Sequence, residues 1–437
     1  MASMAYLSTR GAAPPTTLGQ TILRGLAPDG GLYVPQRLPR IDGAALDASQ
    51  DLELPALARL ALRGFFDGDR LASRLGEIAD AALDLPAPTT AVEASADPLY
   101  ALELFHGPTA AFKDFGARFL AESLERLRSP AEPPLTILVA TSGDTGGAVA
   151  AAFHRRPWVR VVILYPQGLV SPRQEQQLTC WDENVESLRV DGTFDDCQRL
   201  VKEAFVDPDL ARRHRFSSAN SINIGRLLPQ MVYYVASSLE IRRLRGAAAN
   251  YVIPAGNLGN AFAAVWAREL GLPIDRVVLA HNANRTVPDY LASGDWRPRP
   301  SVATIASAMD VGNPSNMERL RSLYPEWRVL RDRVAADSVD DAAIRARIVA
   351  DHRRFGRIWC PHTAAAAEVY ARLPARERAA RPWVLVATAH PAKFNEIVEP
   401  LIGGPVEVPQ SLARLLSLPQ RVRDVAPTLA ALAGAIA

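Results

Sequence analysis

One lysine has the surroundings that covalent catalysis needs. Lys113 lies in the stretch F-H-G-P-T-A-A-F-K-D-F-G, residues 105–116, and only three of the 49 basic residues in the chain are lysines. Arginine stays protonated, whereas a partly desolvated lysine can become a neutral amine that forms a Schiff base with an aldehyde. Phe112 and Phe115 would dry its surroundings. A surface lysine at the start of an amphipathic helix fits the same letters, so composition leaves both interpretations open.

Two glycine-rich stretches have the composition of anion sites at helix N-termini. They read T-S-G-D-T-G-G at 141–147 and P-A-G-N-L-G-N at 254–260, and each follows a predicted strand and opens a predicted helix. The second suits a phosphate but has no Walker lysine, and it is not the G-x-G-x-x-G of a dinucleotide site. Asp144 fits an anion site only if it bonds a hydroxyl or backbone donors. The alternative for the first stretch is an ordinary strand–helix turn.

A third stretch, A-N-S-I-N-I-G-R at 219–226, groups short polar side chains with an arginine. Asn220, Ser221 and Asn223 can donate hydrogen bonds, and Arg226 can hold an oxyanion through two parallel bonds. Taken alone, such Asn and Ser clusters are more often helix caps.

A fourth stretch, V-A-T-A-H-P-A-K-F at 386–394, places a hydroxyl at the end of a predicted strand. Thr388 can bond a heterocyclic ring nitrogen there. His390 and Lys393 are of residue types that are more often structural or exposed. We expect His362, in C-P-H-T, to cap or orient the helix that follows it.

These features converge on pyridoxal phosphate. This cofactor needs an amine for its aldehyde, a cradle for its phosphate and a partner for its ring nitrogen. The second anion site would then receive a phosphorylated or carboxylated substrate.

Composition indicates a soluble globular protein and excludes several classes. The chain of 437 residues is 48% apolar and 22% charged, with a net charge of +2 and no basic patch typical of nucleic-acid binding. Three cysteines without a C-x-x-C pair argue against a metal cluster and fit a reducing compartment. We see no signal peptide and no apolar run that would span a bilayer. A cytoplasmic protein with no membrane partner is therefore expected.

The alternation of short apolar runs and helices predicts an α/β fold with parallel sheets. We expect helices around 52–66 and 71–83, a short helix in the tail at 426–437, and domains at 1–95 (N-terminal module), 96–125 with 235–437 (larger, cofactor-binding) and 126–234 (smaller, mobile). The predicted strands are Leu135–Ala140, Val159–Leu164, Val185–Val190, Tyr251–Ile253, Val277–Ala280 and Trp383–Ala387.

Together the motifs resemble the threonine synthase family of pyridoxal-phosphate enzymes. The resemblance also covers S-T-R-G and D-G-G-L-Y-V-P near the N-terminus and A-M-D-V-G-N-P-S-N at 308–316, so it extends along nearly the whole chain. It implies the tryptophan-synthase-β-like fold (fold type II), with two open, twisted, mostly parallel α/β sheets and a family-specific N-terminal domain.

The resemblance also implies roles for individual residues. Lys113 would carry the cofactor as a Schiff base, and Thr388 would meet the pyridine nitrogen. The other implied contacts are Gly256, Asn257, Leu258, Gly259 and Asn260 for the cofactor phosphate, and Ser142, Gly143, Asp144, Thr145, Asn220, Ser221, Asn223 and Arg226 for the substrate. The chain departs from the family pattern at Leu258, Asn260 and Cys360, where Phe, Asp and an acidic residue are common.

The implied reaction converts O-phospho-L-homoserine and water to L-threonine and phosphate, in a monomer or homodimer. Other lyases on the same scaffold remain alternatives, namely a serine or threonine ammonia-lyase and a phosphohomoserine lyase that ends at a keto acid. A cofactor-binding regulatory protein without activity is the alternative from another class. Asn220 and Arg226 favour a phosphorylated substrate over the ammonia-lyases.

Overall fold

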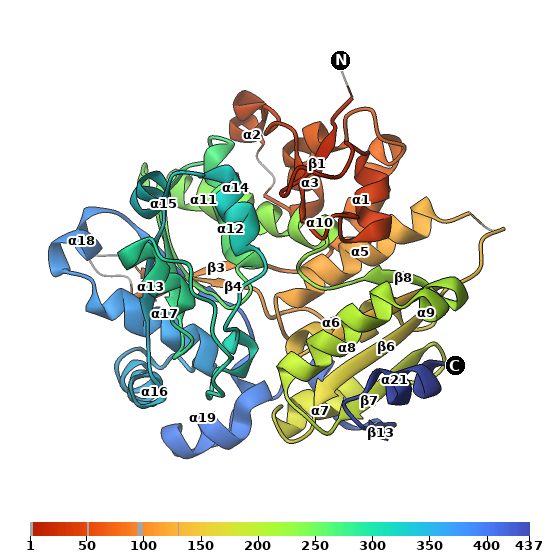
Figure 1. Ribbon diagram of the computed structural model, residues 1–437. Coiled ribbons are helices and arrows are strands. Elements are labelled where there is room, and N and C mark those ends of the chain that lie inside the picture. Colours follow the sequence, from red (N-terminus) through yellow and green to blue (C-terminus); the bar gives the residue numbers. More distant parts are fainter. Residues whose placement is uncertain (1–2, 50–51, 94–98, 130) are drawn as a thin grey trace.

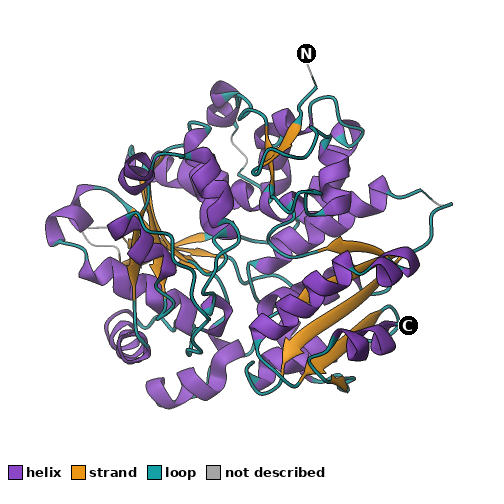
Figure 2. Ribbon diagram, viewed as in Figure 1, coloured by secondary structure: helices purple, strands orange, loops and turns teal. Residues whose placement is uncertain are grey.

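The computed structural model describes residues 3–49, 52–93, 99–129 and 131–437, and two sheets dominate it (Figures 1 and 2). The larger sheet has six strands in the order β11-β10-β9-β12-β4-β3, and every neighbouring pair is parallel except β3 with β4. Its strands are β3 (Thr89–Glu93), β4 (Leu99–Glu103), β9 (Ala249–Pro254), β10 (Ile274–His281), β11 (Ala335–Ser338) and β12 (Trp383–Ala387).

The smaller sheet has five parallel strands in the order β13-β7-β6-β5-β8. Its neighbouring strands β5 and β6 are almost wholly buried, which explains why they read as nearly continuous apolar runs. The strands are β5 (Leu135–Ala140), β6 (Val159–Pro166), β7 (Val185–Val190), β8 (Arg215–Ser218) and β13 (Arg423–Val425).

Helices cover both sheets, and a third part precedes them. The N-terminal part pairs β1 (Tyr6–Ser8) with β2 (Tyr33–Pro35) and packs on the top of the molecule in Figure 1. Its helices are α1 (Leu18–Arg24), α2 (Gly43–Ala48), α3 (Leu54–Ala61) and α4 (Leu75–Ala82), with 3₁₀ turns η1 (Arg63–Phe66) and η2 (Ala72–Arg74). The predicted helices at 52–66 and 71–83 are therefore confirmed, each with a 3₁₀ turn at one end.

The remaining helices alternate with the strands of both sheets. They are α5 (Lys113–Leu127), α6 (Asp144–Phe153), α7 (Pro172–Thr179), α8 (Phe194–Val206), α9 (Pro208–Arg213), α10 (Ile224–Leu227), α11 (Gln230–Arg245), α12 (Gly259–Glu269), α13 (Thr286–Ser293), η3 (Ser307–Met309), α14 (Met317–Leu323), α15 (Trp327–Arg333), α16 (Asp341–Phe355), α17 (Pro361–Arg372), α18 (Ala375–Ala380), η4 (Pro391–Phe394), α19 (Asn395–Ile402), α20 (Gln410–Leu416) and α21 (Leu429–Ile436).

All six predicted strands are present, and each differs by at most a few residues at its ends. The predicted domain limits need two corrections. The boundary at residue 95 lies outside the described residues, and β3, which the prediction gave to the N-terminal module, is an edge strand of the larger sheet. The C-terminal strand β13 pairs with β7, so the tail belongs to the smaller sheet, where α21 also packs (Figure 1). A three-residue edge strand carries too little pattern to reveal which sheet it joins.

Three apolar clusters hold the parts together. The first joins the N-terminal helices to α5, α11 and α12 and to the facing sides of both sheets. The second packs α16 and α17 on the larger sheet, and the third packs α8 and α21 on the smaller sheet. No helix in the described ranges is both long and apolar enough to cross a bilayer.

Candidate active site

Lys113 is the first residue of α5 and lies beside the carboxyl end of β12. Two contacts hold the preceding loop against this strand: the Phe112 N–H donates to the carbonyl oxygen of Thr388 at 2.9 Å, and Ala111 bridges Ala389. The lysine and the strand-end threonine are thus fixed side by side. Lys113 Nζ lies 4.6 Å from the centre of the Phe112 ring.

The turn before Lys113 is braced by a buried carboxylate. Asp114 accepts hydrogen bonds from the backbone N–H of Thr109 at 2.9 Å and from its hydroxyl at 2.6 Å. Gly107 is required beside it, since a Cβ there would come within 2.4 Å of the carboxylate. The F-H-G-P-T stretch is therefore a rigid support for the lysine.

The surroundings of Lys113 favour its neutral form. Burial lowers the pKa of the Lys113 amine, and the nearby charges of Arg226 and Lys393 lower it further, against the opposing effect of Asp144, to about 8. An amine with this pKa is partly unprotonated near neutrality and can act both as a nucleophile and as a base.

A cradle for an anion opens α12 after β9. Leu258, directly before the helix, has a positive φ of 62°, an uncommon conformation for a side chain other than glycine. Gly256 allows the loop to pass close to another segment, because a Cβ at this position would come within 2.9 Å of Met309 Cα. The first backbone N–H groups of α12 have no acceptor within the helix and carry the positive end of its dipole.

Asn260 adds a side-chain donor to this cradle. Its Oδ1 accepts hydrogen bonds from the hydroxyls of Tyr233 at 2.6 Å and Tyr234 at 2.8 Å. These bonds fix the amide, so Nδ2 faces away from both tyrosines, and it is buried without a partner among the described residues. A buried donor without an acceptor is destabilising, and a bound phosphate would satisfy it.

Arg226 supplies a second, separate positive site. It is only 2% exposed, and its guanidinium contacts carbonyl oxygens, those of Ala219 and, at 3.4 Å, of Lys113. Within the described chain its guanidinium bonds carbonyl oxygens and no carboxylate, and its Nε has no acceptor. Burial lowers the pKa of Arg226 to about 10, although Asp114 and Tyr233 oppose this. A buried cation without a counter-charge marks the place of an anionic ligand.

Two residues on the segment before and at the start of α14 connect the two anion sites. Asn316 donates through Nδ2 to the carbonyl of Asn257 at 2.9 Å and to Ser221 at 3.3 Å. Arg319, fully buried, donates to the carbonyls of Ser221 and Ile222 and to Asn316 Oδ1. Sequence reasoning had not singled out either side chain. Asn316 falls within the stretch of resemblance at 308–316, whereas Arg319 lies just beyond it and had no signal.

Asn223 is not where the sequence interpretation expected it. Its side chain is fully buried outside the cavity, donates to the carbonyls of Ile22 and Ser218, and accepts from the Gly225 N–H as the N-cap of α10. Both of its N–H donors and one acceptor site stabilise the loop that carries Arg226, so we exclude it from the substrate contacts. Asn220 does face the cavity, while its Nδ2 also donates to the Ala140 carbonyl at 3.0 Å.

The Ser142–Thr145 loop is held at the opening of α6. Thr141 Oγ1 accepts from the N–H groups of Gly143 and Gly146, and Gly143 has a φ of 131°, which glycine adopts readily. The Asp144 carboxylate pairs with the Lys393 ammonium and accepts a hydrogen bond from Gln174 Nε2. These two partners explain how a carboxylate is accommodated in an anion site. The charge of Asp144 is thus compensated within the protein.

One cavity brings most of the predicted residues together. Gly143 and Asn223 are the two predicted residues that do not line it. Those that do are Lys113, Ser142, Asp144, Thr145, Asn220, Ser221, Arg226, Gly256, Asn257, Leu258, Gly259, Asn260 and Thr388.

The cavity also contains residues that the sequence did not mark as cavity contacts, including Gln230, Met309 and His362. His362 was expected to cap or orient α17, and the capping role is wrong, because Cys360 is the N-cap and accepts from the Thr363 N–H. His362 instead forms part of the wall of the cavity. A wider cleft, partly lined by the N-terminal part, adjoins this cavity at Asn220, Ser221 and Asn257.

The residues present fit pyridoxal phosphate. The cradle at α12 offers helix amides and the unpartnered Asn260 Nδ2, and Lys113 offers an amine with a lowered pKa in the same cavity. Thr388 adds a hydroxyl, not a carboxylate, for a ring nitrogen. When bound, the cofactor would supply an electron-withdrawing ring that stabilises negative charge on substrate carbons.

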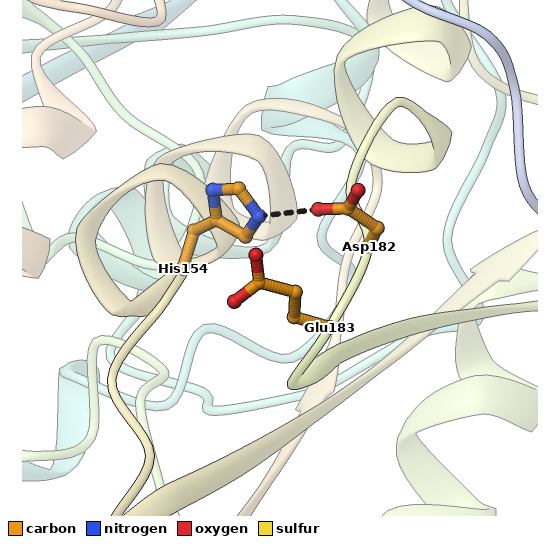
Figure 3. Close-up of side chains that lie close together, drawn as sticks. All are labelled: His154, Asp182 and Glu183. Atoms are coloured by element: carbon orange, nitrogen blue, oxygen red, sulfur yellow. Dashed lines mark hydrogen bonds and ion pairs between the residues drawn. The ribbon is translucent and has the colours of Figure 1, made fainter.

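A second cluster of polar side chains, shown in Figure 3, includes none of the residues that line the cavity. His154, Asp182 and Glu183 have potential ligand atoms within 4.8 Å of one another, and His154 Nε2 lies 2.8 Å from Asp182 Oδ1. Arg155 pairs with Glu183 at 3.0 Å, and Arg421 is 3.8 Å from Asp182. Because arginines already compensate both carboxylates, we interpret the cluster as an ion-pair network and not as a metal centre.

Comparison with known proteins assigns the class that this fold and cavity define. The family model "Pyridoxal-phosphate dependent enzyme" matches residues 82–389. Models for the threonine synthase N terminus and C-terminal part match residues 5–83 and 363–436. The protein is thus a pyridoxal-phosphate-dependent enzyme of fold type II.

Individual relatives define the family more closely. Threonine synthase from Haemophilus influenzae is 39% identical, with 92% of each chain covered, and that from Escherichia coli is 38% identical, with 95% of each covered. Among solved structures, Escherichia coli threonine synthase superposes with a TM-score of 0.90 and Brucella melitensis threonine synthase, with pyridoxal phosphate bound, with 0.88, each over 99% of both chains. The chain belongs to the threonine synthase family.

Proposed function

We propose that this enzyme converts O-phospho-L-homoserine and water to L-threonine and phosphate. The observation that carries the proposal is the pair of anion sites in one cavity with Lys113. The α12 cradle with Asn260 suits the cofactor phosphate, and the buried, unpaired Arg226 suits a second phosphate on the substrate. An enzyme for a substrate without phosphate would have no use for a desolvated cation there.

Lys113 is the proton carrier in this proposal. Its amine, with a pKa of about 8, takes a proton from Cα of the substrate and then assists removal of one from Cβ. The phosphate leaves from Cγ, Lys113 returns one proton to Cγ, water adds at Cβ, and Lys113 returns the other proton to Cα. A single amine can both accept and donate these protons because its pKa lies near the working pH.

Arg226 and its neighbours position the leaving group. Arg226 stabilises the charge on the departing phosphate, and Asn220 and Ser221 border the same side of the cavity. The amides of the Ser142–Thr145 loop bind the substrate carboxylate at the N-terminus of α6. Thr388, with only a hydroxyl, leaves the ring nitrogen of the cofactor largely unprotonated, which disfavours transamination.

One assay tests the proposal. The purified enzyme with pyridoxal phosphate and O-phospho-L-homoserine should release phosphate and L-threonine in equal amounts, and Lys113→Ala should abolish both. L-serine and L-threonine should give no ammonia at comparable rates. A keto acid as the main product, or ammonia release from serine, would overturn the assignment in favour of another lyase.

A further inference from the structure

His362 is a buried wall residue of the cavity to which no role has been attached. It is the second residue of α17 and only 3% exposed, and its ring lies 5.0 Å from that of Phe394. It borders the same space as Lys113 and Thr388.

The hydrogen bonding of His362 selects one tautomer. The backbone N–H of Ala308 donates to Nε2 at 3.1 Å. Nε2 must therefore be the unprotonated nitrogen, and in the neutral ring the proton lies on Nδ1. Burial lowers the pKa of His362 to about 4; the charges of Lys393 and Lys113 lower it as well, and only Asp144 opposes them. The ring is therefore neutral across the working range.

The Nδ1–H group has no acceptor in the described chain. Nδ1 is fully buried, and no atom of residues 3–49, 52–93, 99–129 or 131–437 accepts its hydrogen bond. Buried donors are nearly always paired in native proteins, by protein groups, water or ligand. Since the ring lines the substrate cavity, a bound molecule is the natural acceptor.

The position of the ring indicates which part of the substrate accepts the hydrogen bond from Nδ1–H. The imidazole packs on Phe394, which directly follows Lys393. Lys393 Nζ lies 2.7 Å from Oδ1 of Asp144 at the start of α6, so the imidazole lies near the opening of this helix. On this side the charges of Lys393 and Asp144 compensate each other and the imidazole is a neutral donor, whereas the cationic Arg226 is available for a phosphate dianion.

We propose that His362 is a further substrate-binding residue, whose Nδ1–H donates a hydrogen bond to the α-carboxylate of the amino-acid substrate. This inference rests on the proposed function only in taking an amino acid as the substrate. It assigns to a single imidazole two tasks that can be separated: Nε2 anchors Ala308, and Nδ1 contacts the ligand.

Two substitutions separate these tasks in the enzyme with its cofactor. In His362→Gln the terminal carboxamide reaches the position of Nε2, so it can accept from Ala308 but offers no donor at Nδ1. In His362→Asn the amide nitrogen stands near the position of Nδ1, so the donor is kept and the Ala308 contact is lost. The probes are L-2-aminobutyrate, which has the carboxylate but no phosphate, and inorganic phosphate.

We expect His362→Gln to bind L-2-aminobutyrate about 10- to 100-fold more weakly, the loss expected for one hydrogen bond to a charged group. His362→Asn should stay within about threefold of the parent by the same measure. Spectral titration of the bound cofactor gives these affinities. Calorimetric titration of inorganic phosphate should be unchanged in both variants.

Three outcomes would overturn the inference. If His362→Asn is impaired more than His362→Gln, the ring serves only to anchor Ala308. If phosphate affinity falls while aminobutyrate affinity does not, the acceptor is the phosphate. If neither variant changes aminobutyrate binding, the donor contacts no substrate. Because aminobutyrate is not turned over, these results are independent of which lyase reaction the enzyme performs.

A measurement on the parent protein covers the case in which a variant does not fold. The chain has seven histidines, and the signals of His362 are assigned by replacing the others one at a time. The ¹⁵N shifts of its ring should show Nδ1 protonated and Nε2 unprotonated. Adding L-2-aminobutyrate should shift the Nδ1–H proton downfield. The opposite tautomer, or no change on adding the ligand, contradicts the proposal.

Discussion

Lys393 and Asp144 form a buried ion pair between the two sheets, with Nζ 2.7 Å from Oδ1 and side chains only 1% and 4% exposed. Lys393 lies in η4 after β12, and Asp144 opens α6 after β5. Lys393 Nζ also donates to the carbonyl of Thr109 at 2.9 Å, in the support of the catalytic lysine. Burial alone would raise the pKa of Asp144, but Lys393 and the hydrogen bond from Gln174 lower it to about 2. The pair thus joins the opening of α6 to the Lys113 loop.

Removing one partner of this pair should be costly. In Lys393→Met the length of the side chain is kept and its charge is lost, so Asp144 is left buried and unpaired. We expect the free energy of unfolding, measured in urea, to fall by about 3–5 kcal/mol. The double variant Lys393→Met/Asp144→Asn removes both charges and should recover much of this loss. Equal instability of single and double variants would show that the lost packing, not the unpaired charge, is responsible.

The lowered pKa of Lys113 predicts how the apoenzyme reacts with its cofactor. Only the neutral amine attacks an aldehyde, so the rate should rise with pH and level off above about pH 8. At pH 7.5 about one quarter of the molecules would be reactive, against about one in a thousand for a free lysine. Stopped-flow absorbance of the Schiff base measures the rate. A rate that is still rising tenfold per pH unit at pH 9.5 would contradict the lowered pKa.

Arg226→Gln separates ligand binding from stability. The loss of a charge-assisted contact should raise the KM for O-phospho-L-homoserine by about 10- to 100-fold, with the affinity for the cofactor unchanged. Because Arg226 is a buried cation without a carboxylate partner, the same variant should be at least as stable as the parent without ligands. Steady-state kinetics, cofactor titration and thermal unfolding test the three parts. Loss of the cofactor instead of the substrate would mean that the two anion sites are exchanged.

Asn260→Leu tests the side-chain donor of the cradle. Leucine keeps the approximate size of the side chain, but it cannot donate to a phosphate. We expect the dissociation constant of pyridoxal phosphate to increase about tenfold, the equivalent of 1.4 kcal/mol. Tyr234→Phe, which leaves the bond from Tyr233 to hold the amide, is the matched control and should change it less. Unchanged affinity in Asn260→Leu would place Nδ2 outside the contact with phosphate.

Gly116→Ala tests how Arg226 is seated. A Cβ at this position would lie 2.8 Å from both Nε and the backbone oxygen of Arg226, so the helix and the arginine would have to separate. The charge of Arg226 is retained, yet its position changes. We expect a smaller rise in KM than in Arg226→Gln, with kcat lowered as well. Kinetics identical to those of the parent would mean that the two segments part without moving the guanidinium.

The sequence by itself determined the chemistry and the elements that carry it. The sequence alone reveals Lys113, the α12 cradle and Thr388, because each lies at the start or end of a strand or helix with a clear apolar pattern. Glycines at such points mark close approach of backbones, and continuous apolar runs mark strands buried on both faces. Local pattern is sufficient for these features, since their function depends on residues next to one another in the chain.

Only the tertiary structure decided which polar side chains face the cavity. Asn223 and His362 have similar sequence contexts, each near the start of a helix. The Asn223 side chain nevertheless serves as an N-cap, whereas His362 lines the site. Lys393 meets Thr109 across a separation of 284 residues, and β13 joins a sheet whose other strands precede it by some two hundred positions. Periodicity reports how deeply a residue is buried, not which distant group it meets. That choice depends on how the two sheets pack against each other.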